Sequence, residues 1–273
     1  MNWRETLLKM RASPLGERLI KMSDVDIPWR LPGVDFPVYL QTSKNLSEFL
    51  FGGKEAAERE LFRKIAAYQE MAEFWDIGAN IGQYSWEFLS SGPGKRALMF
   101  EPDERNIKTL RRTIAKSSLM NCEIKEAAAS DTIGRLEFKR DTITGKQGTI
   151  VRDAKIEQYM GRPASLVSIA CTTLDQTSKE LGRAPQLLKV DVEGAEISVI
   201  EGAAATLSAH RPIIVIEILS KNFEPIRQKL APLGYLLYDA VTGQKAHPQS
   251  FNVLAIAPDQ WPKIHQDISS VSR

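Results

Sequence analysis

The strongest constraint on the fold is an alternation of short apolar runs with amphipathic segments, which begins at residue 73. The apolar runs predict strands at residues 73–77, 96–101, 122–128, 186–191, 213–218, 235–239 and 252–257. Helices are predicted between most of them, at residues 81–90, 104–116, 174–181, 195–208 and 223–230. Nearly continuous apolar strands joined by helices are typical of a parallel sheet covered on both faces. The last two strands are joined by a loop alone, which allows an antiparallel return at the edge of the sheet.

The residues ahead of this alternation have a different pattern. Residues 1–72 are predicted to form a helical N-terminal extension or cap, with helices near 2–22 and 54–71 and an extended piece at 38–40. Five basic residues in the first helix leave open a helix that lies on a membrane surface. Pro14 and the acidic residues of the same segment favour a packed cap instead.

The main domain is predicted to span residues 73–260 and to be followed by a tail at 261–273. Residues 132–170 interrupt the alternation with glycines and with two strand-like pieces, at 136–139 and 166–170. This pattern predicts a hairpin insertion between the third and fourth strands of the sheet.

Charge and hydropathy exclude several kinds of protein. Lys and Arg number 36 and Asp and Glu 34, whereas a dedicated nucleic-acid binder usually has a clear basic excess. No apolar run approaches the ~18 residues of a membrane span, and the first 22 residues contain no uncharged segment typical of a secretory signal. We therefore expect a cytoplasmic protein with no nucleic-acid partner and no membrane span.

A glycine loop follows the first predicted strand and opens a helix. Gly78 and Gly82 permit a tight turn and a close approach of the backbone to a ligand. Asn80 stands where a dinucleotide fingerprint has its second glycine, which disfavours a pyrophosphate site. Asp76, just before the loop, suits a nucleoside that carries an ammonium group. An ordinary strand-to-helix turn is the alternative.

A carboxylate ends the second predicted strand. Glu101 lies 19 residues after Gly82 and precedes Pro102, which cannot extend the sheet and forces a turn. A carboxylate in this place can accept hydrogens from ribose hydroxyls. A surface glutamate is the simpler alternative, but the loop and Glu101 together predict a nucleoside site.

A charged block, from Lys189 to Glu196, ends the fourth predicted strand. In a doubly wound sheet this strand lies beside the first, so Asp191 and Glu193 should lie near the glycine loop. Charged groups at a buried strand end are costly and are often functional. Stabilisation of a helix N-terminus explains Glu196 but explains Asp191 and Lys189 poorly.

These blocks, in this order, resemble the FkbM family of class I S-adenosylmethionine-dependent methyltransferases over roughly residues 73–220. The resemblance implies an α/β Rossmann-like fold with a mostly parallel seven-stranded sheet and a reversed edge strand. It also implies methyl transfer from S-adenosylmethionine, usually to a hydroxyl of a sugar or secondary metabolite. The residues that carry it are Asp76 to Gly82, Phe100-Glu101-Pro102, Thr173-Leu174-Asp175, Lys189 to Glu196, Pro212 and Glu217-Ile218.

The resemblance also implies roles for single residues. Asp76 should meet the methionine end of the cofactor, Glu101 the ribose, and Asp191 the sulfonium region. The implied cofactor-binding residues are Asp76, Gly78, Asn80, Gly82, Glu101, Ser130, Asp131 and Asp191. A hydroxyl acceptor needs a base, and the candidate catalytic residues are Asp191, Glu193 and Glu217.

Other readings of these residues stay open. His210 precedes the fifth strand and is expected at the opposite end of the sheet, so it is a weak candidate base; His247 and His265 suit the surface. A divalent metal held by the three candidate catalytic carboxylates is conceivable. N-methylation of a small molecule and a non-catalytic cofactor-binding module are the competing functions.

The acceptor is expected to be a small molecule or a glycan. The segment from Lys139 to Arg162 contains six basic residues and three acidic ones. This local excess suggests that the insertion is a mobile lid that attracts an anionic acceptor. A solvated loop with ordinary surface charges is the alternative.

Overall fold

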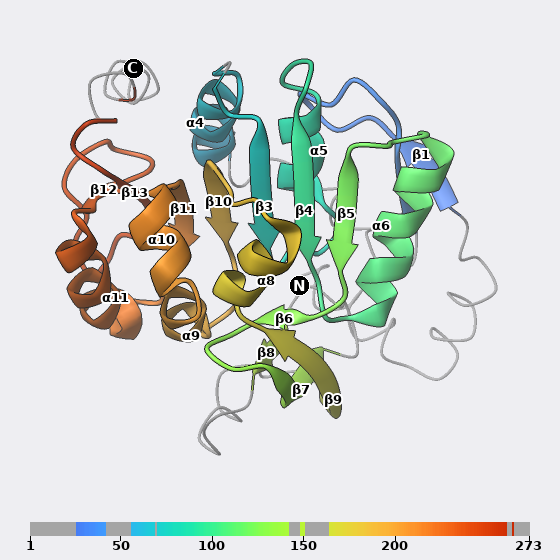
Figure 1. Cartoon of the computed structure of the whole chain (residues 1–273). Coiled ribbons are helices and arrows are strands. Elements are labelled where there is room, and N and C mark those ends of the chain that lie inside the picture. The colour runs from blue at the N-terminus through green and yellow to red at the C-terminus, as the bar shows by residue number, and fades with distance from the viewer. Residues whose placement is uncertain are drawn as a thin grey trace, which may run out of the picture.

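The computed structural model describes residues 26–41, 56–68, 70–141, 148–150, 164–260 and 264. A seven-stranded sheet lies at its centre (Figure 1). In order across the sheet, the strands are β12 (Leu236–Asp239), β13 (Asn252–Ile256), β11 (Ile213–Glu217), β10 (Leu187–Val190), β3 (Glu73–Ile77), β4 (Arg96–Phe100) and β5 (Cys122–Lys125). The predicted helix near residues 2–22 lies outside the described residues, as does the tail apart from residue 264.

The sheet is parallel except for its last strand in the chain, β13, which pairs antiparallel with both β11 and β12. A reversed last strand was expected, but it lies second from the edge, and β12 is the edge strand. The crossover helix α11 (Phe223–Leu230) carries the chain two strand positions from β11, which leaves one position empty between β11 and β12. The returning chain then fills the gap that this crossover leaves.

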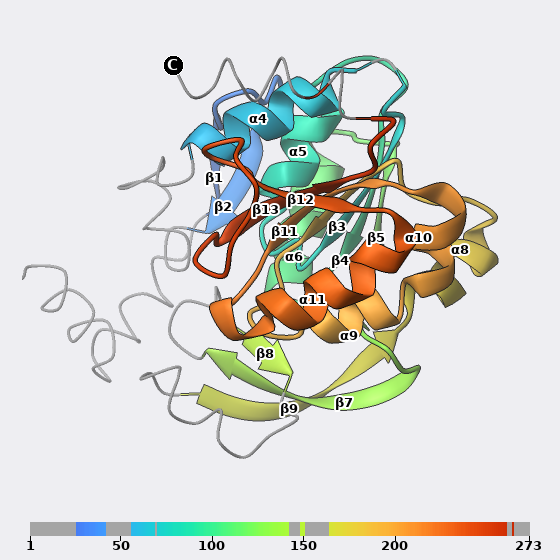
Figure 2. The same ribbon diagram turned by 90° about the vertical axis from the view of Figure 1, so that its left-hand side faces the viewer.

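Helices cover both faces of the sheet (Figure 2). One face carries α4 (Ala56–Ala66), α5 (Gln83–Leu89) and α6 (Glu104–Lys116), and the other carries α8 (Leu174–Leu181), α9 (Glu196–Glu201), α10 (Ala204–His210) and α11. Side chains of each strand alternate between the two cores. In β3, Phe74 packs on the α4 and α5 side and Trp75 on the other side, both fully buried.

One predicted helix is in fact two. The helix predicted at 195–208 breaks at Gly202, where a Cβ atom would lie 1.9 Å from the carbonyl oxygen of Ser130. Asp175 caps the N-terminus of the second helix, α10. Its carboxylate accepts hydrogen bonds from the backbone N–H groups of Ala205 and Thr206 at 3.0 and 2.7 Å. Close packing against the loop at Ser130 therefore decides the break, and periodicity alone did not reveal it.

The N-terminal region is not purely helical. Strands β1 (Asp26–Trp29) and β2 (Val38–Gln41) pair antiparallel. The sequence predicted an extended piece at 38–40 but no partner for it. Helix α4 then packs into the same core as the sheet, since Phe62 and Ile65 are fully buried there.

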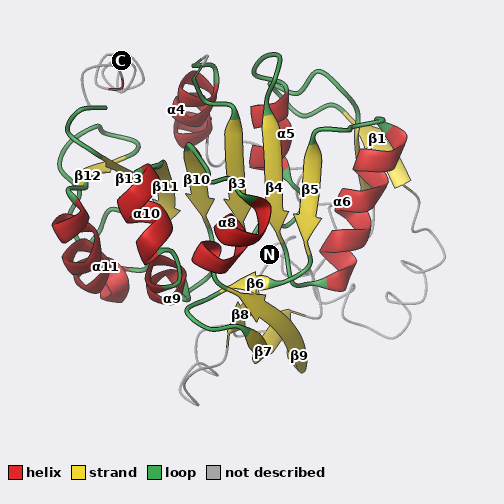
Figure 3. Ribbon diagram, viewed as in Figure 1, coloured by secondary structure: helices red, strands yellow, loops and turns green. Residues whose placement is uncertain are grey.

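The insertion forms a second sheet (Figure 3). Its strands, in the order β6-β9-β7-β8, are β6 (Ala128–Ala129), β9 (Ala164–Thr172), β7 (Gly134–Asp141) and β8 (Gly148–Ile150). The predicted antiparallel pair is present, with Phe138 opposite Val167. The strand predicted at 122–128 ends earlier, because Ala128 and Ala129 pair with β9 instead. This small sheet lies beyond the carboxyl ends of the parallel strands.

Candidate functional site

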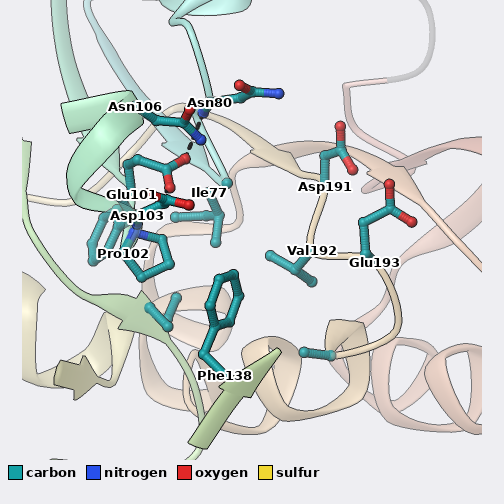
Figure 4. Close-up of a pocket in the computed structure, with 15 residues that line it drawn as sticks. Ile77, Asn80, Glu101, Pro102, Asp103, Asn106, Phe138, Asp191, Val192 and Glu193 are labelled. Carbon is teal, nitrogen blue, oxygen red and sulfur yellow. Dashed lines mark hydrogen bonds between the residues drawn. The ribbon is translucent and has the colours of Figure 1, made fainter. Parts of the chain in front are cut away.

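A cavity opens where the large sheet meets the small one (Figure 4). Its volume is about 670 Å³ when the open solvent at its mouth is included. The carboxyl ends of β3, β4 and β10 supply one wall, and the insertion supplies another. The lining residues are Ile77, Gly78, Asn80, Phe100, Glu101, Pro102, Asp103, Asn106, Ala128, Ala129, Phe138, Asp191, Val192, Glu193 and Ala195.

Glu101 is the buried polar centre of one side. Its side chain accepts from the backbone N–H of Asn80 at 2.7 Å and from that of Asp103 at 2.8 Å, and the residue is 4% exposed. Burial raises the pKa of this carboxyl to about 7, against the pull of those two bonds and of one from Asn106. A carboxylate offers about four acceptor positions, so Glu101 can still receive a hydroxyl hydrogen.

Asp191 and Glu193 lie across the cavity from Glu101 (Figure 4). The backbone ties their loop to the glycine loop, because the Asp191 N–H donates to the Ile77 carbonyl at 2.9 Å. Gly78, at φ +83°, has no room for a side chain: a Cβ atom would lie 1.9 Å from the Asp191 carbonyl oxygen. The two loops that carry the site are thus in direct backbone contact.

Two non-glycine residues in the cavity wall have left-handed backbones. Asn80 has φ 53° and Glu193 has φ 50°. Such conformations are rare for a glutamate and concentrate at functional sites. Burial raises the pKa of Glu193, and the neighbouring charges of Glu217 and Glu196 raise it further.

The rest of the wall is apolar. Ile77, Phe100 and Pro102 come from the large sheet, and Phe138 enters from β7 of the small sheet. The Phe138 ring points into the cavity and is 7% exposed (Figure 4). The sequence analysis missed this residue, because nothing in the insertion signalled which of its apolar side chains would face the site.

Four of the implied cofactor residues do not line the cavity. Asp76 is buried on the opposite side of β3, where the Ser85 hydroxyl donates to it at 2.7 Å and burial raises its pKa to about 6. Gly82 precedes α5, with Trp86 against the position of its missing side chain. Ser130 is fully buried and, like its neighbour Asp131, lies outside the lining.

The candidate bases are not equivalent. Asp191 and Glu193 line the cavity, whereas Glu217 is not part of its lining and forms an ion pair with Lys189 at 3.0 Å. His210 ends α10, before β11 begins, and is exposed, so it lies at the far end of the sheet. Among the described residues, no group of three or more His, Cys, Asp or Glu side chains is placed to hold a metal ion.

This arrangement fits a nucleoside that carries a positive charge. An acceptor for a ribose hydroxyl, an apolar wall with an aromatic ring, and carboxylates on the far side meet in one cavity. S-adenosylmethionine has these parts. Within the described ranges no helix is long and apolar enough to cross a membrane; the cytoplasmic location stays a prediction.

Comparison with known proteins shows which family the sequence matches. The methyltransferase FkbM domain model matches residues 76–237. The chain is 29% identical over 184 residues to 2-O-methyltransferase NoeI of Sinorhizobium fredii (strain NBRC 101917 / NGR234), which covers 63% of this chain and 75% of that protein.

Solved structures show weaker likeness. Methyltransferase FkbM from Methylobacillus flagellatus KT aligns at 20% identity and a TM-score of 0.47, over 68% of this chain but only 44% of that chain. Fibrillarin of Aeropyrum pernix, solved with bound S-adenosyl-L-methionine, aligns at 10% identity and a TM-score of 0.42, over 84% of this chain and 81% of that one.

The family model spans more than half of the chain and covers the glycine loop, Glu101 and the block from Lys189 to Glu196. The mostly parallel seven-stranded sheet with a reversed last strand in the chain agrees with the fold that the resemblance implied, although that strand is not at the edge. The resemblance seen in the sequence is therefore confirmed, and the chain belongs to the FkbM family of S-adenosylmethionine-dependent methyltransferases.

Proposed function

We propose that this protein transfers the methyl group of S-adenosylmethionine to a hydroxyl of a sugar or a glycan. The observation that carries the proposal is the pair of carboxylates, Asp191 and Glu193, that faces Glu101 across one cavity. A hydroxyl must lose its proton as it is methylated, and a nearby carboxylate can accept it. The similarity to a 2-O-methyltransferase supports oxygen as the acceptor atom.

The cofactor supplies an already activated methyl group, so the protein acts mainly by alignment. Glu101 binds the ribose, and the side chains of Ile77, Pro102 and Phe138 enclose the adenine ring. Gly78 lets the loop after β3 lie against the loop of Asp191. Asp191, across the cavity from Glu101, would place its negative charge near the positively charged sulfonium of a bound cofactor.

Incubation with radiolabelled S-adenosylmethionine tests this function. The acceptors are a panel of methyl glycosides, their 2-deoxy counterparts and a matched set of small amines. We expect label to enter a glycoside as a base-stable methyl ether, and to be lost with the 2-deoxy analogue if the site resembles that of the relative. Label in amines alone, or none at all despite cofactor binding, would refute the proposal.

We further propose that the acceptor is anionic and is attracted by the basic insertion. Lys139 lies on β7 beside the cavity-lining strand residues, whereas most of the basic residues counted between 139 and 162 lie outside the described residues. Their attraction for an anion should fade as salt rises. Comparing the salt dependence of KM for wild type and an Arg140→Ser, Lys146→Ser, Arg152→Ser variant tests this. A KM for the acceptor that depends less on salt concentration in the variant than in wild type supports attraction of an anionic acceptor by the insertion. Identical salt dependence of KM in the two proteins contradicts it.

A further inference from the structure

A row of charged side chains crosses the α4 and α5 face of the sheet behind the cavity. The Lys189 ammonium lies 3.0 Å from Glu58 Oε1 on one side and 3.0 Å from Glu217 Oε1 on the other. Glu58 comes from α4, 131 residues away in sequence. The row therefore joins the N-terminal region to the strand end that carries a candidate base.

Lys189 has no access to water, since its side chain is 0% exposed. A buried ammonium is costly unless partners compensate it. Here the two carboxylates compensate it, and the Tyr84 ring lies 4.8 Å from the ammonium. Burial alone would lower the pKa of Lys189, but Tyr84, Glu58, Glu217 and Asp191 together hold it well above its ordinary value. Lys189 is thus a fixed cation and cannot serve as a base.

The two ends of the row differ in exposure. The Glu58 side chain is 1% exposed, and its Oε1 also accepts from the Tyr84 hydroxyl at 2.9 Å. The Glu217 side chain is 14% exposed. Of the two carboxylates, only Glu217 therefore has appreciable contact with solvent.

Strand register brings that open end to the site. Val190 of β10 pairs with Ile216 of β11, so the next residues, Asp191 and Glu217, lie level at the carboxyl ends of neighbouring strands. Asp191 lines the cofactor cavity. Glu217 thus lies one strand beyond Asp191 at the same edge of the sheet, next to the cavity wall that Asp191 supplies.

We propose that Lys189, held from behind by Glu58, is a positioning residue that fixes the Glu217 carboxylate as the base for the acceptor hydroxyl. The inference rests on the proposed O-methyl transfer. The acceptor oxygen bonds to the methyl carbon while the carbon–sulfur bond breaks and its electron pair stays on sulfur. The hydroxyl proton passes to a Glu217 carboxylate oxygen. Helix α4, although it precedes the matched family segment, then belongs to the catalytic apparatus.

The test compares single and combined variants in methyl transfer to the best methyl glycoside of the panel. Lys189→Met alone would leave Glu58 buried without its cation, and Glu58 Oε2 already lacks a hydrogen-bond partner in the described part of the chain. A Glu58→Gln, Lys189→Met double variant removes both charges and protects folding. Lys95→Met is the matched control: Lys95 is also buried, but carbonyl oxygens of Ala66, Tyr68 and Met71 hold it, at 2.6 to 2.7 Å.

Glu217→Gln should lower kcat by about 100-fold or more, the usual contribution of a general base. The kcat of the double variant should fall by a similar factor, and its KM for the cofactor should be unchanged. Adding Glu217→Gln to the double variant should cause no further fall, because Lys189 acts through Glu217. Lys95→Met should keep kcat within about twofold of wild type.

Two results would overturn the inference while leaving the proposed function intact. One is a wild-type kcat in the double variant. The other is a triple variant whose loss of kcat equals the product of the losses in the double variant and in Glu217→Gln, because independent effects of this kind mark a merely structural role for Lys189. A crystal structure of the double variant with S-adenosylhomocysteine gives a readout that needs no acceptor. The Glu217 carboxylate should leave its wild-type position, and an unchanged position would also refute the inference. Failure of wild type to methylate any glycoside would instead refute the proposed function.

Discussion

At the scale of single residues, burial sets the protonation of one carboxyl group in the cavity and of another on the opposite side of β3. Glu101 and Asp76 are both almost fully buried, and desolvation raises the pKa of each, to about 7 and about 6. A raised pKa places the titration of these groups near neutral pH, so cofactor binding and stability should both depend on pH.

Cofactor affinity should weaken as the pH falls below about 7. Glu101 carries a proton there in the free protein, and a protonated carboxyl offers fewer acceptor positions to the ribose. Binding must then expel that proton, so the Kd for S-adenosylhomocysteine should rise by about tenfold per pH unit below the pKa. Calorimetry between pH 5.5 and 8.5 measures it. Glu101→Gln should bind more weakly by about 1–3 kcal/mol and without this slope; an identical slope in the variant would exclude Glu101 as its source.

Asp76→Asn should stabilise the fold at neutral pH. A carboxyl with a raised folded-state pKa contributes stability below its ordinary pKa and loses it as the pH rises through the folded value, about 6 for Asp76. The shift corresponds to about 3 kcal/mol. The variant cannot ionise at this position. Its free energy of unfolding, relative to that of wild type, should therefore rise between pH 4 and 6 and remain higher above pH 7. Urea unfolding across this range measures the difference; a gap that does not change with pH would contradict the prediction.

At the scale of elements, strand β7 shows how an insertion becomes part of a binding site. It pairs with β9 along its whole length and turns Phe138 toward the cavity. Leu136, two residues earlier, is on the same face but packs against the core of the small sheet and does not line the cavity. The two residues form a natural comparison.

Phe138→Ala should weaken cofactor binding by about tenfold, because a buried aromatic ring contributes roughly 1.5–3 kcal/mol and part of it faces the ligand. Leu136→Ala should cost stability without changing the Kd for S-adenosylhomocysteine. Calorimetry and thermal unfolding of both variants separate the two effects. Equal losses of affinity would mean that the small sheet acts only as a scaffold.

Most elements could be predicted from the sequence because their apolar periods are regular. Helices α6, α8 and α11 and strand β3 have the predicted ends. The break at Gly202 could not be predicted, since it depends on a carbonyl group more than 70 residues away. The reversed strand was expected, but its place inside the sheet depends on how far a crossover helix carries the chain.

At the scale of the whole molecule, the sheet separates two cores, and the N-terminal helix α4 belongs to one of them. Arg59 of α4 forms a buried ion pair with Glu87 of α5, and Lys95 bonds three carbonyl groups at and after the end of α4. Helix α4 is thus tied to α5 and to the start of β4 by buried polar contacts, in addition to its apolar packing.

Helix α4 should therefore unfold only together with the sheet. Native-state hydrogen exchange over a series of low denaturant concentrations should give α4 the same opening free energy and the same denaturant dependence as β3 and β10. The exposed loop at 241–251 should open locally and serves as the internal control. A separate, lower opening free energy for α4 would show that it is an independent cap.

Several residues of the candidate site could be predicted from motifs in the sequence, whereas a contact between two distant elements could not. Gly78, Glu101 and Asp191 belong to short motifs whose spacing predicts where they meet. The contact between Glu58 and Lys189 joins residues 131 positions apart, with no motif at Glu58. Only the packing of α4 on the sheet reveals it.

That ion pair also limits how such proteins can be recombined. Glu58 lies ahead of the matched segment at 76–237, and Lys189 lies within it. A chimera that grafts the matched segment onto another leading sequence would bury a lysine without one of its two counter-charges, a loss that typically costs several kcal/mol. Exchange between relatives should succeed more often when α4, α5 and β10 are inherited from the same parent, because Tyr84 of α5 contacts both Glu58 and Lys189.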